Sequence, residues 1–125
     1  MTALVDTSVL VEFLRGHEGA RDLLEAERAA GALHASEITR LEILAGMRPA
    51  EEEPTRLLLG ALVWHGVDPR VAEEAGKLGR RWLPTHHGID SADLAIAATA
   101  ILVRARLLTL NVRHFPMFPD LRRPY

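Results

Sequence analysis

Short, continuously apolar runs alternate along this chain with longer stretches in which apolar residues recur every three or four positions. The first pattern predicts strands that are covered on both faces, and the second predicts helices with one buried side. Strands are expected at residues 3–5, 32–36, 63–67 and 106–110. Because strand and helix alternate, we expect an α/β fold in three layers, with helices on both faces of a central, mainly parallel sheet.

Capping residues, glycines and prolines set the expected ends of the helices. Ser36 is a good N-cap, Pro69 can open a helix, and Gly16 can end one. Helices are therefore expected over residues 7–15, 18–30, 37–47, 52–64, 69–82 and 90–105. Residues 84–88 are expected to form a loop, and residues 111–125 a loop with a last short strand.

The composition is that of a folded domain. Of the 125 residues, 48% are hydrophobic, which argues against disorder, and we expect one domain over residues 1–125. No uncharged run approaches the roughly 18 residues of a membrane span, and no signal segment is visible, so a soluble cytoplasmic protein is expected. Because the sequence has no cysteine, disulfides, thiolate metal sites and cysteine nucleophiles are excluded.

Basic residues gather toward the carboxyl end of the chain. The formal net charge is −2, yet residues 104–125 hold five arginines and a single acid, Asp120. Arginine forks match phosphate oxygens, so one interpretation is a basic edge that faces nucleic acid. The other is a solvated surface without a partner.

Two of the expected strands end in a residue with a side-chain oxygen. Asp6 follows the strand at 3–5, and Asn111 follows the strand at 106–110. Open α/β sheets place their ligands at the carboxyl ends of strands, so the two residues suggest neighbours around one pocket. The alternatives are a helix-capping or turn role for Asp6 and a turn role for Asn111.

Glu42 lies on the helix expected over 37–47. Its neighbours at helical spacing, Ile38, Leu41 and Ala45, predict that this face is buried. No basic residue lies one helical turn away, so Glu42 needs a partner from outside its helix. That partner is either a distant arginine or a metal ion.

Asp90 and Asp93 stand at the start of a helix that is apolar almost all round. The helix dipole favours anions at this end, and deep packing would place both carboxylates beside strand ends. In the alternative interpretation, Asp90 is only the N-cap and Asp93 only a first-turn carboxylate.

Taken together, these carboxylates suit a hard divalent cation. Mg²⁺ or Mn²⁺ prefers carboxylate and carbonyl oxygens together with water, and Asp6, Glu42, Asp90 and Asp93 would supply them. Without a cation, such a cluster would repel itself or raise its pKa values. A cation held there could polarise a phosphoryl oxygen and activate water, as phosphodiester hydrolysis requires.

Four segments carry a family resemblance: LVDTSVLVEFLRG, ASEITRLEILAGM, DSADLAIAATAI and LLTLNVRHF. In this order they resemble the PIN-domain family, and within it the VapC-type toxins of toxin–antitoxin pairs. The resemblance implies a PIN-like fold and a Mg²⁺-dependent endoribonuclease in which Mn²⁺ can substitute. It also implies a homodimer that joins a small cognate antitoxin in a hetero-oligomer, with DNA contacted only through the antitoxin.

The resemblance also implies which residues form the site. By position, the three acids are Asp6, Glu42 and Asp93, and the hydroxyl of Thr7 or Ser8 would support the first of them. These residues would hold the ion, and RNA would be the substrate.

Further positions are less uniform across the family. Asp90 matches a position that is often polar, so it is either a fourth ligand or only the helix cap. Asn111 stands where many members have an aspartate; its amide can orient a water or a ligand but supplies no charge and no base. Arg113 could contact an RNA phosphate or an antitoxin carboxylate, and His114 could anchor the loop.

Two other classes of protein remain as alternatives. A non-catalytic PIN-like module that binds RNA or protein is suggested by Asn111, although the intact acids argue against it. A phosphoacceptor receiver domain would need paired acids after its first strand and a lysine at the end of a late strand. Here Asp6 stands alone, and Lys77 lies within an expected helix.

Overall fold

Four parallel strands form the centre of the fold in a computed structural model that describes residues 2–125. Their order is β3-β2-β1-β4, with the bounds β1 (Ala3–Val5), β2 (Leu33–Ser36), β3 (Val63–His65) and β4 (Arg106–Leu108). Because every pairing is parallel, all four strands end at the same edge of the sheet, which we call the carboxyl edge.

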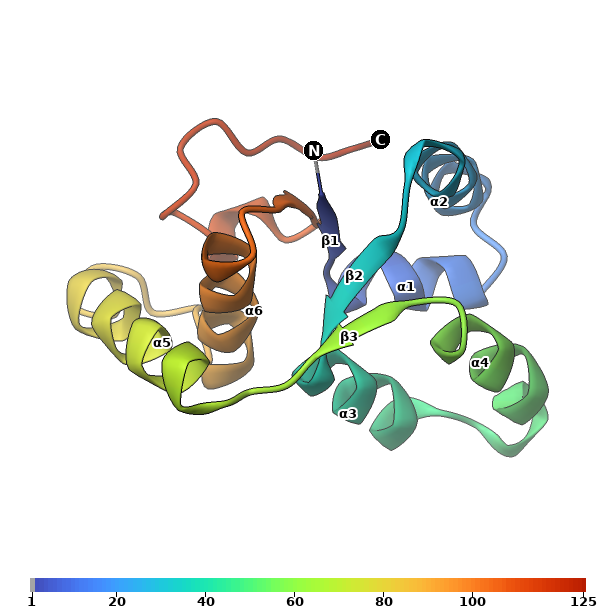
Figure 1. Ribbon diagram of the computed structural model, residues 1–125, viewed down its shortest axis with the longest axis horizontal. Coiled ribbons are helices and arrows are strands. Elements are labelled where there is room, and N and C mark those ends of the chain that lie inside the picture. Colours follow the sequence, from blue (N-terminus) through green and yellow to red (C-terminus); the bar gives the residue numbers. More distant parts are fainter. Residues whose placement is uncertain (1) are drawn as a thin grey trace.

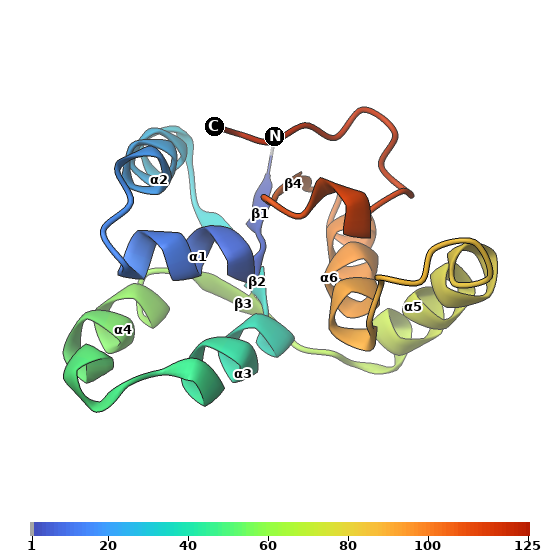
Figure 2. The same cartoon turned by 180° about the vertical axis from the view of Figure 1, so that it is seen from behind.

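Helices cover both faces of this sheet. They are α1 (Thr7–Leu14), α2 (Glu18–Ala30), α3 (Glu37–Gly46), α4 (Glu52–Leu59), α5 (Pro69–Trp82) and α6 (Ser91–Leu102). Figures 1 and 2 show α5 and α6 on one side of the sheet and α1, α2 and α4 on the other. The expected α/β fold with three layers and a parallel sheet is therefore confirmed.

Buried apolar side chains form one cluster on each face of the sheet. Val5 packs in the cluster under α1, α2 and α4, whereas the preceding residue, Leu4, packs with Ile96 of α6. Successive residues of one strand point to opposite faces, so both must be apolar when both faces are covered. This explains why the first strand is a continuous apolar run.

The helix expected over 52–64 was predicted too long. The fourth helix ends at Leu59, and residues 63–65 instead form β3, with Trp64 paired to Ala35 of β2. Backbone groups that bond to a neighbouring strand cannot also bond along a helix. The expected strand at 63–67 is present in its first half.

The chain after α6 also differs from expectation. α6 stops at Leu102, because Arg104 takes the left-handed φ of 56°, which an α-helix cannot continue. The last short strand is not found, since no strand follows β4 within residues 109–125. Three prolines in this stretch, at 116, 119 and 124, lack the N–H that strand pairing needs.

The buried face of α3 was predicted wrongly. Leu41 is 61% exposed and Ala45 is also exposed, whereas Thr39 and Ile43 are buried. Two stripes at helical spacing run along this helix, one through Leu41 and Ala45 and one through Thr39 and Ile43. The contacts of the helix with α1, α6 and β2 bury the stripe through Thr39 and Ile43. Glu42, on the same helix, is half-buried.

The carboxyl-terminal tail runs past the amino ends of the strands and finishes near α2 (Figure 1). There the hydroxyl of Tyr125 donates a 2.9 Å hydrogen bond to Oε1 of Glu12, and its ring lies 5.2 Å from that of His17. Burial and the Glu12 carboxylate raise the pKa of Tyr125 to about 12. The tail thus ties the last residue to the α1–α2 junction.

Within residues 2–125, none of the helices combines the length and the apolar character needed to cross a bilayer.

Candidate active site

Asp6 lies at the carboxyl edge, directly after β1, and is 3% exposed. Its Oδ2 accepts two hydrogen bonds of 2.7 Å, one from the hydroxyl of Ser8 and one from that of Thr109. Although Asp6 occupies the N-cap position of α1, its side chain makes no cap hydrogen bond. A helix-capping role therefore does not account for the buried carboxylate.

The partner of Glu42 is a hydroxyl and not an arginine. Oγ1 of Thr7 donates a 2.6 Å hydrogen bond to Oε1 of Glu42 and lies 3.0 Å from Oγ1 of the buried Thr39. Of the two hydroxyls expected to support the first acid, Ser8 does so, and Thr7 supports the second. A neutral donor leaves the charge of Glu42 uncompensated, so this carboxylate can still attract a cation.

Asp90 and Asp93 form a capping box at the start of α6. Oδ1 of Asp90 accepts a 2.8 Å hydrogen bond from the backbone N–H of Asp93, and the backbone N–H of Asp90 donates to Oδ2 of Asp93 at 3.1 Å. Asp90 is exposed, whereas Asp93 is buried. The geometry thus gives Asp90 a complete role as a helix cap and places only Asp93 in the interior.

Burial raises the pKa of Asp93 to about 6. The hydrogen bond from the Asp90 backbone opposes this shift, while the neighbouring Asp90 carboxylate adds to it. Nδ1 of His114 lies 3.2 Å from Oδ2 of Asp93 and favours the ionised form. A cation bound near Asp93 would favour that form further.

The loop after β4 reaches both of the buried acids. Thr109 contacts Asp6, and His114 contacts Asp93. Asn111 lies between them and donates its backbone N–H to Oγ1 of Thr109 at 3.0 Å. The side chains of Asn111 and Arg113 are exposed and make no hydrogen bond or ion pair with the part of the chain that the structure describes.

Thr109 was not among the predicted site residues, and His114 was predicted only as a loop anchor. A polar residue inside an apolar strand, directly before the strand ends, was the available signal for Thr109. No local pattern signalled that His114 would lie against Asp93, because the two residues come from different elements.

The basic residues near the carboxyl end do not form one basic edge. Arg104 and Arg106 lie at the opposite edge of the sheet, where α6 ends and β4 begins. Arg106 is also paired with Glu27 at 2.7 Å. Only Arg113 follows a strand at the carboxyl edge, close to the acids.

The carboxylate oxygens at this edge are suitable ligands for a hard divalent cation, although the protein does not supply a complete set of ligands. Among the described residues 2–125, no three acidic or histidine side chains converge on one point. Mg²⁺ commonly takes only one or two carboxylates and keeps several waters. Asp6 and Asp93 could supply these two carboxylates, because hydrogen bonds from the protein occupy only Oδ2 of each.

Comparisons with known proteins find relatives that match almost the whole chain. The PIN domain family model matches residues 3–119. The chain is 48% identical over 123 residues to ribonuclease VapC19 of Mycobacterium tuberculosis, covering 98% of each chain. It is 40% identical over 122 residues to ribonuclease VapC10 of the same organism, covering 98% of this chain and 92% of that protein.

Solved structures share the fold. A toxin–antitoxin complex from Klebsiella pneumoniae has a TM-score of 0.82 at 28% identity, covering 99% of this chain and 98% of that one. VapBC2 from Rickettsia felis, bound to a DNA fragment from its promoter, has a TM-score of 0.80 at 24% identity. It covers 97% of this chain and 96% of that one.

Proposed function

This chain belongs to the PIN-domain family, and we propose that it is the ribonuclease toxin of a toxin–antitoxin pair, an endoribonuclease that hydrolyses RNA phosphodiester bonds. The observation that carries the proposal is the arrangement of acids at the carboxyl edge. Asp6, Glu42 and Asp93 come from three elements, and each has a partner that fixes its orientation. Such preorganised carboxylates are what metal-assisted hydrolysis requires.

Mg²⁺, for which Mn²⁺ can substitute, suits the site, because the carboxylates of Asp6, Glu42 and Asp93 offer hard oxygen donors. When bound, it polarises a phosphoryl oxygen and the attacking water. Asp6 and Asp93 would hold the ion through the oxygens that the protein leaves free, and Glu42 would add negative charge from α3, which packs against α1 and α6. Thr7 and Ser8 keep two of these carboxylates in place.

Arg113 positions the RNA. Its guanidinium is exposed on the turn next to His114 and is not engaged by the described residues, so it can form a forked contact with a phosphate. Asn111, which is also exposed, can orient a water or a ribose hydroxyl through its amide.

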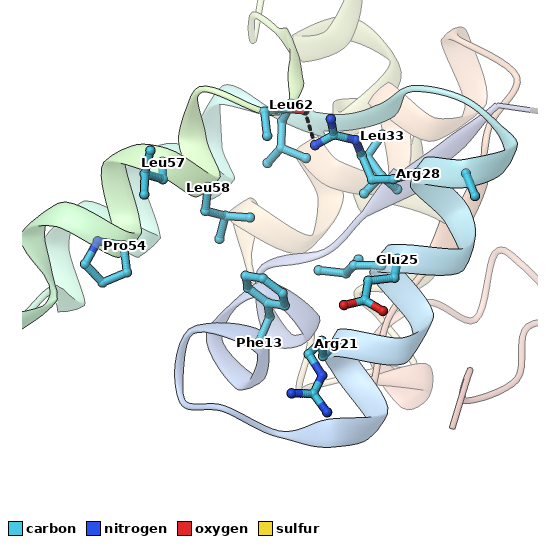
Figure 3. A pocket seen from close by; sticks show the side chains of 12 residues that line it. Phe13, Arg21, Glu25, Arg28, Leu33, Pro54, Leu57, Leu58 and Leu62 are labelled. Carbon is cyan, nitrogen blue, oxygen red and sulfur yellow. Dashed lines mark hydrogen bonds between the residues drawn. The ribbon is translucent and has the colours of Figure 1, made fainter.

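A groove away from the acids suits the antitoxin. It has a volume of about 700 Å³ and lies between α2 and α4, over a floor that includes Phe13, Leu33 and Leu58 (Figure 3). Leu57 stands at its rim and is 71% exposed. An apolar groove of this size fits an amphipathic segment of a partner. A homodimer completes the proposed assembly. Light scattering measures the mass of the chain without antitoxin, which reports the homodimer, and with antitoxin, which reports the complex.

The test is cleavage of total RNA by the purified chain, free of antitoxin, in Mg²⁺, Mn²⁺ or EDTA. The control is the double variant Asp6→Ala, Asp93→Ala, checked for folding by circular dichroism. We expect cuts at discrete sites that require the cation and are absent from the variant. Folded protein that binds RNA and cuts none under any condition would indicate the non-catalytic module instead.

A further inference from the structure

The two buried acids are held in the same way. In Asp6, Oδ2 accepts both hydroxyl hydrogen bonds, from Ser8 and from Thr109. In Asp93, Oδ2 receives the backbone N–H of Asp90 and lies 3.2 Å from Nδ1 of His114. Each carboxylate therefore has one oxygen fixed by the protein, and no described residue donates to its other oxygen, Oδ1.

The turn that carries His114 is anchored on both sides. On one side, the backbone N–H of Asn111 donates to Oγ1 of Thr109. Within the turn, the N–H of His114 donates to the carbonyl of Asn111 at 2.9 Å. On the other side, Phe115 is 1% exposed and packs with Leu4 and Ile96 in the core. The backbone of His114 is thus held in place by the fold, independently of the contact between its ring and Asp93.

The ring also has a defined orientation. Nδ1 faces Asp93, and Nε2 faces Gly88, where an added Cβ would lie 3.7 Å away. A carboxylate that pairs with Nδ1 selects the tautomer with the proton on that nitrogen. Nδ1 of His114 therefore lies next to Oδ2 of Asp93 at ion-pair distance.

We propose that His114 is a positioning residue that fixes Oδ2 of Asp93 and thereby aims Oδ1 at the cation. This role rests on the proposed function, since it assumes that Asp93 holds the ion. In this role His114 acts on the ion through the carboxylate that it orients. Side chains that orient a metal ligand in this way typically change metal affinity by roughly 10- to 100-fold when they are removed.

Two amide substitutions separate this role from simple packing. In His114→Asn, the amide nitrogen takes the place of Nδ1, so a nitrogen that can donate is kept next to Asp93. In His114→Gln, an equally polar amide reaches toward the place of Nε2, beside Gly88. The variant His114→Ala removes both nitrogens, and His87→Ala removes an exposed histidine from the preceding loop as a control.

The experiment measures Mn²⁺ binding to each full-length variant by electron paramagnetic resonance, together with its melting temperature and RNA cleavage. We expect His114→Ala and His114→Gln to bind Mn²⁺ about ten-fold more weakly, with His114→Asn and His87→Ala close to wild type. The proposal would be overturned if His114→Ala bound Mn²⁺ as tightly as wild type does. It would also be overturned if folded His114→Gln and His114→Asn variants bound Mn²⁺ equally well.

Failure of the nuclease function is recognised separately. If the wild-type chain binds Mn²⁺ but cuts no RNA, the proposed activity is wrong, while the ranking of the variants in Mn²⁺ binding still decides the role of His114. If the wild-type chain neither binds Mn²⁺ nor cuts RNA, both proposals are wrong.

Discussion

The hydroxyl of Thr109 donates a 2.7 Å hydrogen bond to Oδ2 of Asp6 and joins two strand ends that are 103 residues apart in the sequence. Both residues are fully or almost fully buried, at 0% and 3% exposure. The same hydroxyl oxygen accepts the backbone N–H of Asn111. Thr109 therefore links the first acid to the loop that also reaches the third.

Replacing Thr109 by valine tests this link at constant shape. Thr109→Val leaves a buried carboxylate and the N–H of Asn111 each without one partner, so we expect a loss of about 1.5–3 kcal/mol in the free energy of unfolding. RNA cleavage should fall as well, because Asp6 is less well oriented. Urea unfolding and a cleavage assay measure the two effects. Thr85→Val, at an exposed hydroxyl, is the control; an equal loss there would contradict the assignment.

The hydroxyl of Thr7 is expected to matter for the second acid. Thr7→Val removes the 2.6 Å donor to Glu42, whereas Thr7→Ser keeps it. We expect RNA cleavage to fall roughly ten-fold in the valine variant, since the loss resembles that of an orienting partner, and to stay near wild type in the serine variant. Initial rates at saturating RNA measure this. Similar rates for the two variants would show that Glu42 does not need the hydroxyl.

The stability of the cation-free chain should depend on pH through Asp93. Its pKa is raised from 3.8 to about 6, so the stability that this group contributes is fully present below about pH 4 and is lost as the pH rises through 6. Asp93→Asn cannot ionise. Between pH 4 and 7 in EDTA, we expect wild type to lose about 2 kcal/mol relative to this variant. Urea unfolding at each pH measures the difference, and a constant difference would contradict the raised pKa.

A charge at the rim of the groove should separate antitoxin binding from catalysis. Leu57→Glu places a carboxylate where an apolar partner segment would pack, so we expect antitoxin binding to weaken by at least ten-fold while RNA cleavage is unchanged. Leu41→Glu is a matched control, because Leu41 is 61% exposed but does not line the groove. Titration of cleavage with the cognate antitoxin measures both variants. Equal inhibition of the two would place the antitoxin elsewhere.

The contact between Gly19 and Tyr125 predicts that the effect of Gly19→Ala on the free energy of unfolding depends on Tyr125. A Cβ on Gly19 would lie 2.7 Å from Cδ1 of Tyr125, so Gly19→Ala must displace the ring and should destabilise the chain by about 1–2 kcal/mol. With Tyr125→Ala already present, the same change should cost less, because only His17, whose Cε1 would lie 3.1 Å from the Cβ, must then give way. A double-mutant cycle in urea measures this coupling, and additive effects would show that the tail is not held there.

Much of the site was predictable because it depends on local order. An apolar run that ends in Asp6, and a helix that opens with Asp90 and Asp93, are set by neighbours a few residues apart. These patterns placed all three acids at the boundaries of their elements. The match of residues to family segments assigned Glu42 to the site, whereas periodicity alone left its partner open between an arginine and a metal ion.

The sequence by itself determined the alternation of strands and helices, the parallel sheet, and the elements that carry the three acids. Only the tertiary structure decided that Thr39 and Ile43, and not Leu41, face inward, and that Thr109 and His114 hold the acids. Periodicity is a property of a single segment, so it can be read along the chain. The rotation of a helix and the partner of a buried carboxylate depend on contacts between distant segments, which form only when the chain is folded.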